Sequence, residues 1–66
     1  MKLTVNGQAR EVPEGVTLAV LLGQLKVEGE RVAVEVNTRV VRRARHAEHR
    51  LAEGDQIEIV TFVGGG

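Results

Sequence analysis

The sequence predicts a single α+β domain in which a small mixed β-sheet clasps one α-helix. Apolar and polar residues alternate over several short segments, which is typical of half-buried strands, and only one segment has leucines at helical spacing. The chain has 66 residues, 42% of them hydrophobic and mostly aliphatic, enough for one modest core but not for a deep catalytic cleft. We therefore expect a folded domain over residues 1–63 and a flexible glycine tail over residues 64–66.

The first element is a β-hairpin. Residues 2–5 alternate, Asn6-Gly7 suits the two positive-φ positions of a type I′ turn, and residues 8–12 form the returning strand. In this register Lys2 faces Glu11, while Leu3 and Val5 share a face with polar residues. The inner face of the hairpin is therefore only partly apolar.

The second element is the helix, which begins after the predicted N-cap Thr17. Its apolar residues recur at i, i+3, i+4 and i+7 and form one stripe: Leu18, Leu21, Leu22 and Leu25. A helix with one leucine face requires a sheet to cover it.

The second half of the chain contains the remaining strands. We expect, in order, a strand over residues 32–36, a turn at 37–38, a short strand around Val40 and Val41, a polar irregular segment over 42–50, a turn at 53–55 and a last strand from Gln56 to about Phe62. A mixed sheet that clasps a single helix placed after the first hairpin is the β-grasp (ubiquitin-like) arrangement.

Charge and composition exclude several classes of function. Nine basic residues balance nine acidic ones, so no overall field favours nucleic acid or an anionic membrane, and no aromatic residue except Phe62 is available for base stacking. There is no apolar run long enough to cross a bilayer, and the absence of cysteine removes disulfides and thiolate metal sites. We expect a cytoplasmic protein that binds neither nucleic acid nor membrane.

The segment Gly64-Gly65-Gly66 is not explained by any helix or strand. It is either a frayed chain end or a functional tail. Residues without Cβ can enter a narrow channel of another enzyme, where the carboxylate of Gly66 would lie beside ATP. Adenylation would convert that carboxylate into an acylating group.

Several segments together resemble one family. They are the Asn6-Gly7 turn, residues 34–43 (VEVNTRVVRR), residues 53–59 (EGDQIEI) and the Gly65-Gly66 ending. With the order of elements they resemble the ThiS family, the sulfur carriers of thiamine biosynthesis, over essentially the whole chain. The additional Gly64 before the final pair departs from the usual ending of that family.

The resemblance implies a carrier rather than an enzyme. An E1-like adenylyltransferase of the ThiF type would use ATP to activate the carboxylate of Gly66, and a persulfide donor would supply sulfur, which leaves a C-terminal thiocarboxylate. A thiazole synthase of the ThiG type would then accept the sulfur. The resemblance implies no bound cofactor and no catalytic residue in this chain, because its partners supply the reacting groups.

Other functions stay open on the sequence alone. The same chemistry could deliver sulfur to molybdopterin synthesis or to tRNA thiolation. Gly66 could instead form an isopeptide bond with a lysine, as ubiquitin-like modifiers do. A binding module that makes no use of its tail is a further alternative.

Two groups of residues are candidates for docking a partner enzyme. Val60, Phe62 and Val63 lie at the end of the last strand, where alternation places Val60 and Phe62 opposite Ile57 and Ile59. The alternative is that Phe62 belongs to the core. A basic cluster consists of Arg39, Arg42, Arg43 and Arg45. It is a solvated, partly ion-paired face, a docking surface for a partner protein, or a contact for a phosphate or RNA.

His46 and His49 are close enough in sequence to meet on a helical turn and share a metal with Glu48. Two histidines without a third strong ligand are more often surface residues. We therefore predict no metal site.

Overall fold

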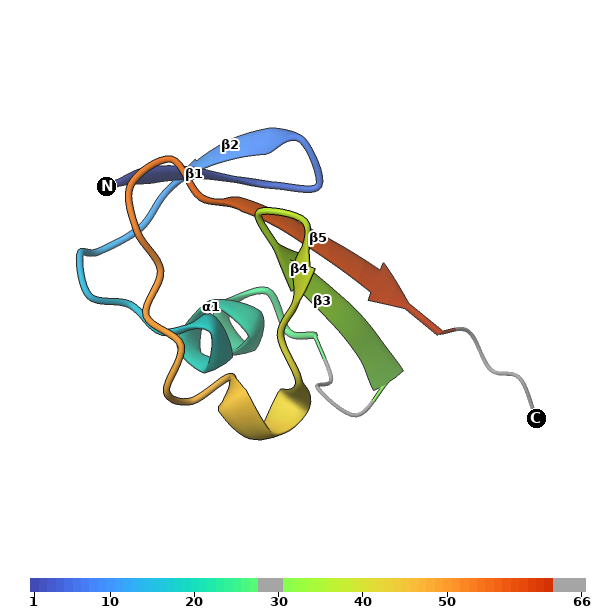
Figure 1. Ribbon diagram of the computed structural model, residues 1–66. Coiled ribbons are helices and arrows are strands. Elements are labelled where there is room, and N and C mark those ends of the chain that lie inside the picture. The colour runs from blue at the N-terminus through green and yellow to red at the C-terminus, as the bar shows by residue number, and fades with distance from the viewer. Residues whose placement is uncertain (28–30, 63–66) are drawn as a thin grey trace.

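The computed structural model of the chain describes residues 1–27 and 31–62. The elements within these residues follow the predicted order (Figure 1): β1 (Lys2–Val5), β2 (Gln8–Glu11), α1 (Leu18–Gln24), β3 (Val32–Val36), β4 (Arg39–Val40), the 3₁₀ helix η2 (Arg43–Arg45) and β5 (Gln56–Thr61).

The five strands form one mixed sheet in the order β2-β1-β5-β3-β4. The central pair, β1 and β5, is parallel, and the other neighbours are antiparallel. Helix α1 lies against one face of this sheet (Figure 1). The arrangement confirms the predicted β-grasp fold, with β2 and β4 as its edges.

The first hairpin has the predicted register. Lys2 is opposite Glu11 and Leu3 is opposite Arg10. At the turn, Asn6 has a φ of 50° and Gly7 a φ of 82°, the two left-handed positions that a type I′ turn requires. Every residue of β2 is exposed, so this edge strand contributes backbone hydrogen bonds rather than buried apolar surface.

Helix α1 also begins where predicted. The Thr17 hydroxyl accepts a hydrogen bond from the amide of Val20 at 3.3 Å, which satisfies one of the free N–H groups of the first turn. The leucine stripe lies against the sheet, with Leu18 and Leu21 fully buried. Leu25 is the C-cap residue and is half-buried.

The segment predicted to be irregular, residues 42–50, supports the start of this helix. The amide of Leu18 donates to the carbonyl of His49 and the amide of Ala19 donates to the carbonyl of His46, both at 2.9 Å. The segment therefore satisfies two further N–H groups at the helix N-terminus. It contains η2, which lies beside α1 in Figure 1 and was not predicted from the sequence.

Among the described residues, eleven buried apolar side chains form the core: Leu3, Val5, Val12, Val16, Leu18, Leu21, Leu22, Val34, Val36, Leu51 and Ile57. They come from α1, from the inner faces of β1, β3 and β5, and from the connecting loops. No helix within the described ranges is long and apolar enough to cross a membrane.

A network of hydrogen bonds between exposed Asn37 and buried Asp55 holds the start of β5. The Asn37 side chain donates to a carboxylate oxygen of Asp55 at 2.9 Å, and its carbonyl accepts the amide of Gln56 at 3.0 Å. The other Asp55 oxygen accepts the amide of Ala52 at 2.8 Å. The network joins the β3–β4 turn to β5 and therefore sets the direction in which β5 runs.

Candidate functional site

The candidate site is the end of β5, from which the chain continues toward Gly66. Val63 and the predicted tail Gly64, Gly65 and Gly66 lie outside the described residues. Strand β5 ends at Thr61, one residue before the predicted boundary. The amide of Phe62 still donates to the carbonyl of Arg31 at 2.8 Å, so the backbone remains fixed up to this residue.

Strand β5 is held on both sides near this end. On one side it pairs with β3, including Val60 with Ala33. On the other side β1 has already ended, and the Asn6 side chain replaces it: Oδ1 accepts the amide of Ile59 at 2.7 Å and Nδ2 donates to its carbonyl at 3.3 Å. Asn6 therefore completes the sheet where β1 stops.

The sequence indicated Asn6 only as a turn residue. Its second role could not be predicted without the parallel pairing of β1 and β5, which brings residues 53 positions apart into contact. The available signal was the choice of Asn rather than Asp or Gly before Gly7, because only the amide offers both a donor and an acceptor.

The outer face of the sheet, which α1 does not cover, carries exposed apolar side chains. Val60 and Phe62 are 57% and 59% exposed, whereas Ile57 on the opposite face is fully buried. Ala33 pairs with Val60, and we call Ala33, Val60 and Phe62 the outer apolar patch. Phe62 is not part of the core, so the core alternative is wrong, while the docking role stays a prediction.

Val40 is an apolar surface residue that the sequence did not single out. It is 67% exposed on the edge strand β4 and pairs with Glu35. The sequence pattern did not find it because a two-residue strand shows no alternation.

Two carboxylates lie directly opposite each other beside the outer apolar patch. Glu35 on β3 pairs with Glu58 on β5, and neither makes an ion pair within residues 1–27 and 31–62. Like charges at directly opposed positions of a sheet destabilise it. The free protein therefore keeps an unfavourable pair on this face.

Substituting Glu58→Gln should raise the free energy of unfolding by about 0.5 kcal/mol, because it removes this repulsion without a change in shape. Urea unfolding at low ionic strength measures the difference. Glu14→Gln, at an exposed loop position, is the matched control because it removes the same charge. Equal stability of the two variants would mean that the opposed carboxylates do not repel measurably.

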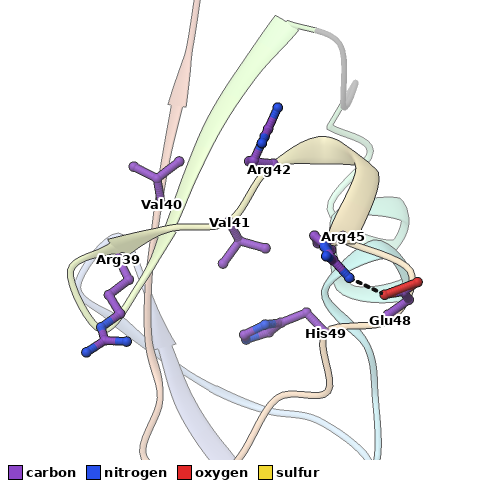
Figure 2. Close-up of a pocket in the computed structure, with 7 residues that line it drawn as sticks. All are labelled: Arg39, Val40, Val41, Arg42, Arg45, Glu48 and His49. Carbon is purple, nitrogen blue, oxygen red and sulfur yellow. Dashed lines mark hydrogen bonds and ion pairs between the residues drawn. The ribbon is translucent and has the colours of Figure 1, made fainter.

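The predicted docking residues occupy two separate surfaces. Arg39 pairs with Val36, whose side chain faces the core, so Arg39 lies on the opposite side of β4 from the outer apolar patch. With Arg42 it borders a groove of about 440 Å³ between β4 and η2, shown in Figure 2. We call this the basic groove; it is lined by Arg39, Val40, Val41, Arg42, Arg45, Glu48 and His49.

The structure places the two histidines in different surroundings, since His46 is buried and His49 lines the basic groove. His46 is buried, which corrects the expectation of a surface residue, and its Nε2 lies 2.9 Å from the carbonyl oxygen of Val41. Because a carbonyl only accepts, Nε2 carries the proton in this bond. The described part of the chain contains no group of three potential metal ligands.

The sequence of the whole chain is similar to proteins of known families. The model of the ThiS family matches residues 3–66. A thiazole synthase of Paramagnetospirillum magneticum is 42% identical over all 66 residues, and one of Magnetococcus marinus is 46% identical. This chain spans only 20% of the length of each of these two enzymes.

Smaller relatives match along their whole length. The sulfur carrier protein ThiS of Escherichia coli is 33% identical, with both chains covered completely. The crystal structure of a thiamine biosynthesis protein (ThiS) from Geobacter metallireducens is 39% identical, matches with a TM-score of 0.85 and is also covered completely. The β-grasp sheet, the sequence match and these relatives agree, and the chain therefore belongs to the ThiS family.

Proposed function

We propose that this chain is a sulfur carrier whose reactive group is the carboxylate of Gly66. A carboxylate oxygen attacks the α-phosphorus of ATP, and pyrophosphate leaves, so that an acyl adenylate forms. A persulfide sulfur then attacks the acyl carbon and AMP leaves. A thiol reduces the remaining sulfur–sulfur bond, which releases the chain as a thiocarboxylate.

The observation that carries this proposal is the family match that extends through Gly66. The match to the E. coli sulfur carrier covers both chains in full and supports the same residue. In this cycle the chain is a protein cosubstrate rather than an enzyme. An E1-like adenylyltransferase supplies the ATP site and a persulfide donor supplies sulfur, so the carrier needs no cofactor and no base of its own.

The outer apolar patch is the proposed docking surface for the adenylyltransferase. Exposed aromatic and aliphatic side chains at the centre of an interface contribute most of its binding free energy. Phe62 precedes Gly66 by four residues, and a fully extended chain spans at most roughly 14 Å over that distance. A partner that holds Phe62 and Val60 therefore confines the Gly66 carboxylate to a small volume around its own ATP site, and Val63 lies within that connection.

Substituting Phe62→Asp should lower kcat/KM for adenylation about 30-fold or more, because it places a charge where an apolar anchor is expected to be buried. Steady-state pyrophosphate exchange with varied carrier concentration measures the effect. The melting temperature should change little, since Phe62 is already 59% exposed.

Val20→Asp is the matched control for this experiment. Val20 is a 50% exposed apolar residue on α1, which covers the opposite face of the sheet. The Val20→Asp variant should retain nearly the full kcat/KM of the unsubstituted chain. An equal loss of kcat/KM in both variants, or no loss in the Phe62 variant, would exclude the outer apolar patch as the docking surface.

The proposed sulfur acceptor is a thiazole synthase. Its support is the similarity of this chain to a segment of two thiazole synthases. We place the cycle in the cytoplasm, because a chain without cysteine needs no oxidising compartment.

The acceptor is tested by comparing three candidate acceptor enzymes. The thiocarboxylate form is incubated separately with a thiazole synthase and its substrates, with a molybdopterin synthase partner and with a tRNA thiolation enzyme, and the loss of thiocarboxylate is followed by intact mass. We expect rapid consumption only by the thiazole synthase. Consumption by another acceptor, or transfer of the chain to lysines, would reject this destination.

A further inference from the structure

The basic groove between β4 and η2 has an excess of positive charge. Three arginines and one glutamate line it, which leaves two uncompensated positive charges, although the whole chain has no net charge. The Glu48 carboxylate is already paired with Arg45 at 3.1 Å. The surplus therefore resides on Arg39 and Arg42.

Within the described part of the chain, these two guanidinium groups have no partner. Neither side chain makes a hydrogen bond or an ion pair within residues 1–27 and 31–62. Both residues are exposed, at opposite ends of the short stretch that carries Val40 and Val41. Planar guanidinium groups that are free and close to apolar surface are well suited to bind carboxylates.

The floor of the groove is apolar. Val41 is half-buried at the margin of the core, whereas Val40 is 67% exposed at the rim, on the outer face of the sheet that it shares with its pairing partner Glu35. In Figure 2 the His49 ring lies toward Val41, between the basic residues. A ligand that fits this surface must combine anionic groups with apolar ones.

The directions of the side chains distinguish a small anion from an extended chain. Figure 2 shows that the guanidinium groups of Arg39 and Arg42 point away from each other, while that of Arg45 is directed at Glu48. A single phosphate needs donors that converge on one point. Donors that are spread along a groove instead fit carboxylates at successive positions of a polypeptide.

We propose that the basic groove binds an acidic segment of a partner protein that also contains apolar side chains. Carboxylates of the segment pair with Arg39 and Arg42, and an apolar side chain covers Val41. The groove shares no residue with the outer apolar patch, so the proposal stands independently of adenylation at Gly66. Because the pairs are exposed, the contribution of the groove is to orientation and association rate as well as to affinity.

The test uses NMR titration of the ¹⁵N-labelled chain with a short, end-capped, glutamate-rich peptide that contains leucines. We expect saturable changes in amide shifts within residues 39–49 and none in the β1–β2 hairpin. The same peptide with glutamine in place of glutamate should not bind. Raising NaCl from about 50 to about 300 mM should weaken binding several-fold, since exposed pairs are screened over this range.

Variants with altered charge assign the binding to the groove. Arg39→Glu should weaken binding of the peptide about tenfold, whereas Arg10→Glu should change the affinity less than twofold. Both residues are exposed arginines on edge strands, and both changes alter the net charge equally. Arg42→Glu provides a second variant of the groove, and Arg39→Lys should retain part of the affinity because the charge remains.

Three results would overturn the proposal. One is equal weakening by Arg39→Glu and Arg10→Glu, which would mean non-specific attraction. Another is displacement of the peptide by equimolar inorganic phosphate, which would mean a small-anion site. The last is self-association of the free chain, detected by sedimentation and abolished by Arg39→Glu, which would mean that a second copy occupies the groove.

Discussion

A chain that ends in a carboxamide instead of a carboxylate at Gly66 should accept no AMP from its adenylyltransferase. Adenylation requires a carboxylate oxygen as the nucleophile, and an amide cannot replace it. The 66-residue chain is short enough for chemical synthesis, so the two forms can differ in this one group alone. Pyrophosphate exchange should fall to background, a complete loss rather than a change in KM.

The carboxamide leaves the rest of the molecule unchanged. Among the described residues, the buried core lies between Leu3 and Ile57, so the melting temperature should equal that of the free acid. Removal of one glycine is the matched control, because the shortened chain still ends in a Gly-Gly pair with a free carboxylate. Measurable exchange by the carboxamide form would place the reactive group elsewhere in the chain.

Substituting Leu21→Ala should remove a large part of the folding free energy. Leu21 is fully buried between α1 and the sheet, and truncation of such a leucine costs about 2–5 kcal/mol through lost burial and the cavity that remains. A domain of this size has a total stability of roughly 3–10 kcal/mol. We therefore expect a midpoint of urea unfolding that is far lower, or a chain that is partly unfolded without denaturant.

Val20→Ala is the control for this substitution. Val20 is the neighbouring residue on the same helix but is 50% exposed, so its truncation should change stability by less than about 1 kcal/mol. The difference in stability between the two variants separates the effect of burial from the effect of helix propensity. A Leu21 variant as stable as the Val20 variant would contradict the assignment of the leucine stripe to the core.

The sequence predicted those elements whose signals are local. The Asn6-Gly7 turn determines the hairpin register, and the observed pairing of Lys2 with Glu11 follows from it. Thr17 and the leucine stripe determined the start and the buried face of α1 in the same way. In each case the residues that decide the structure lie within a few positions of one another.

The features that were not predicted depend on contacts between distant segments. His46 looked like a surface residue because its neighbours are polar, but its carbonyl accepts a hydrogen bond from Ala19 and its ring contacts Val41. The segment over residues 42–50 is ordered by α1 rather than by its own periodicity. No pattern within that segment predicts η2.

The candidate site also combines features that local signals predicted with features that depend on distant contacts. Alternation along the last strand predicted that Val60 and Phe62 point away from Ile57, and both are exposed. The separation of Arg39 and Arg42 from this patch was not predictable, because it depends on which side of β4 each side chain occupies. The support of β5 by Asn6 depends on the parallel pairing of the first and last strands.

The surfaces and the tail suggest a division of tasks within a small carrier. The outer apolar patch lies directly before the last residues of the chain, and in the proposed cycle it holds the protein while Gly66 reacts. Arg39 of the basic groove lies on the other side of β4, and the groove shares no residue with that patch. A partner could therefore contact both surfaces, or two partners could use one each.

The central claim is that sulfur is carried on the Gly66 carboxylate, and one measurement tests it most directly. The chain is incubated with ATP, an E1-like adenylyltransferase and a persulfide donor, and intact and fragment masses are recorded. Exchange of one oxygen for sulfur should add about 16 Da, confined to the C-terminal fragment that contains Gly66. An unchanged mass while the same enzymes modify the E. coli carrier, or a gain on any other fragment, would contradict the account.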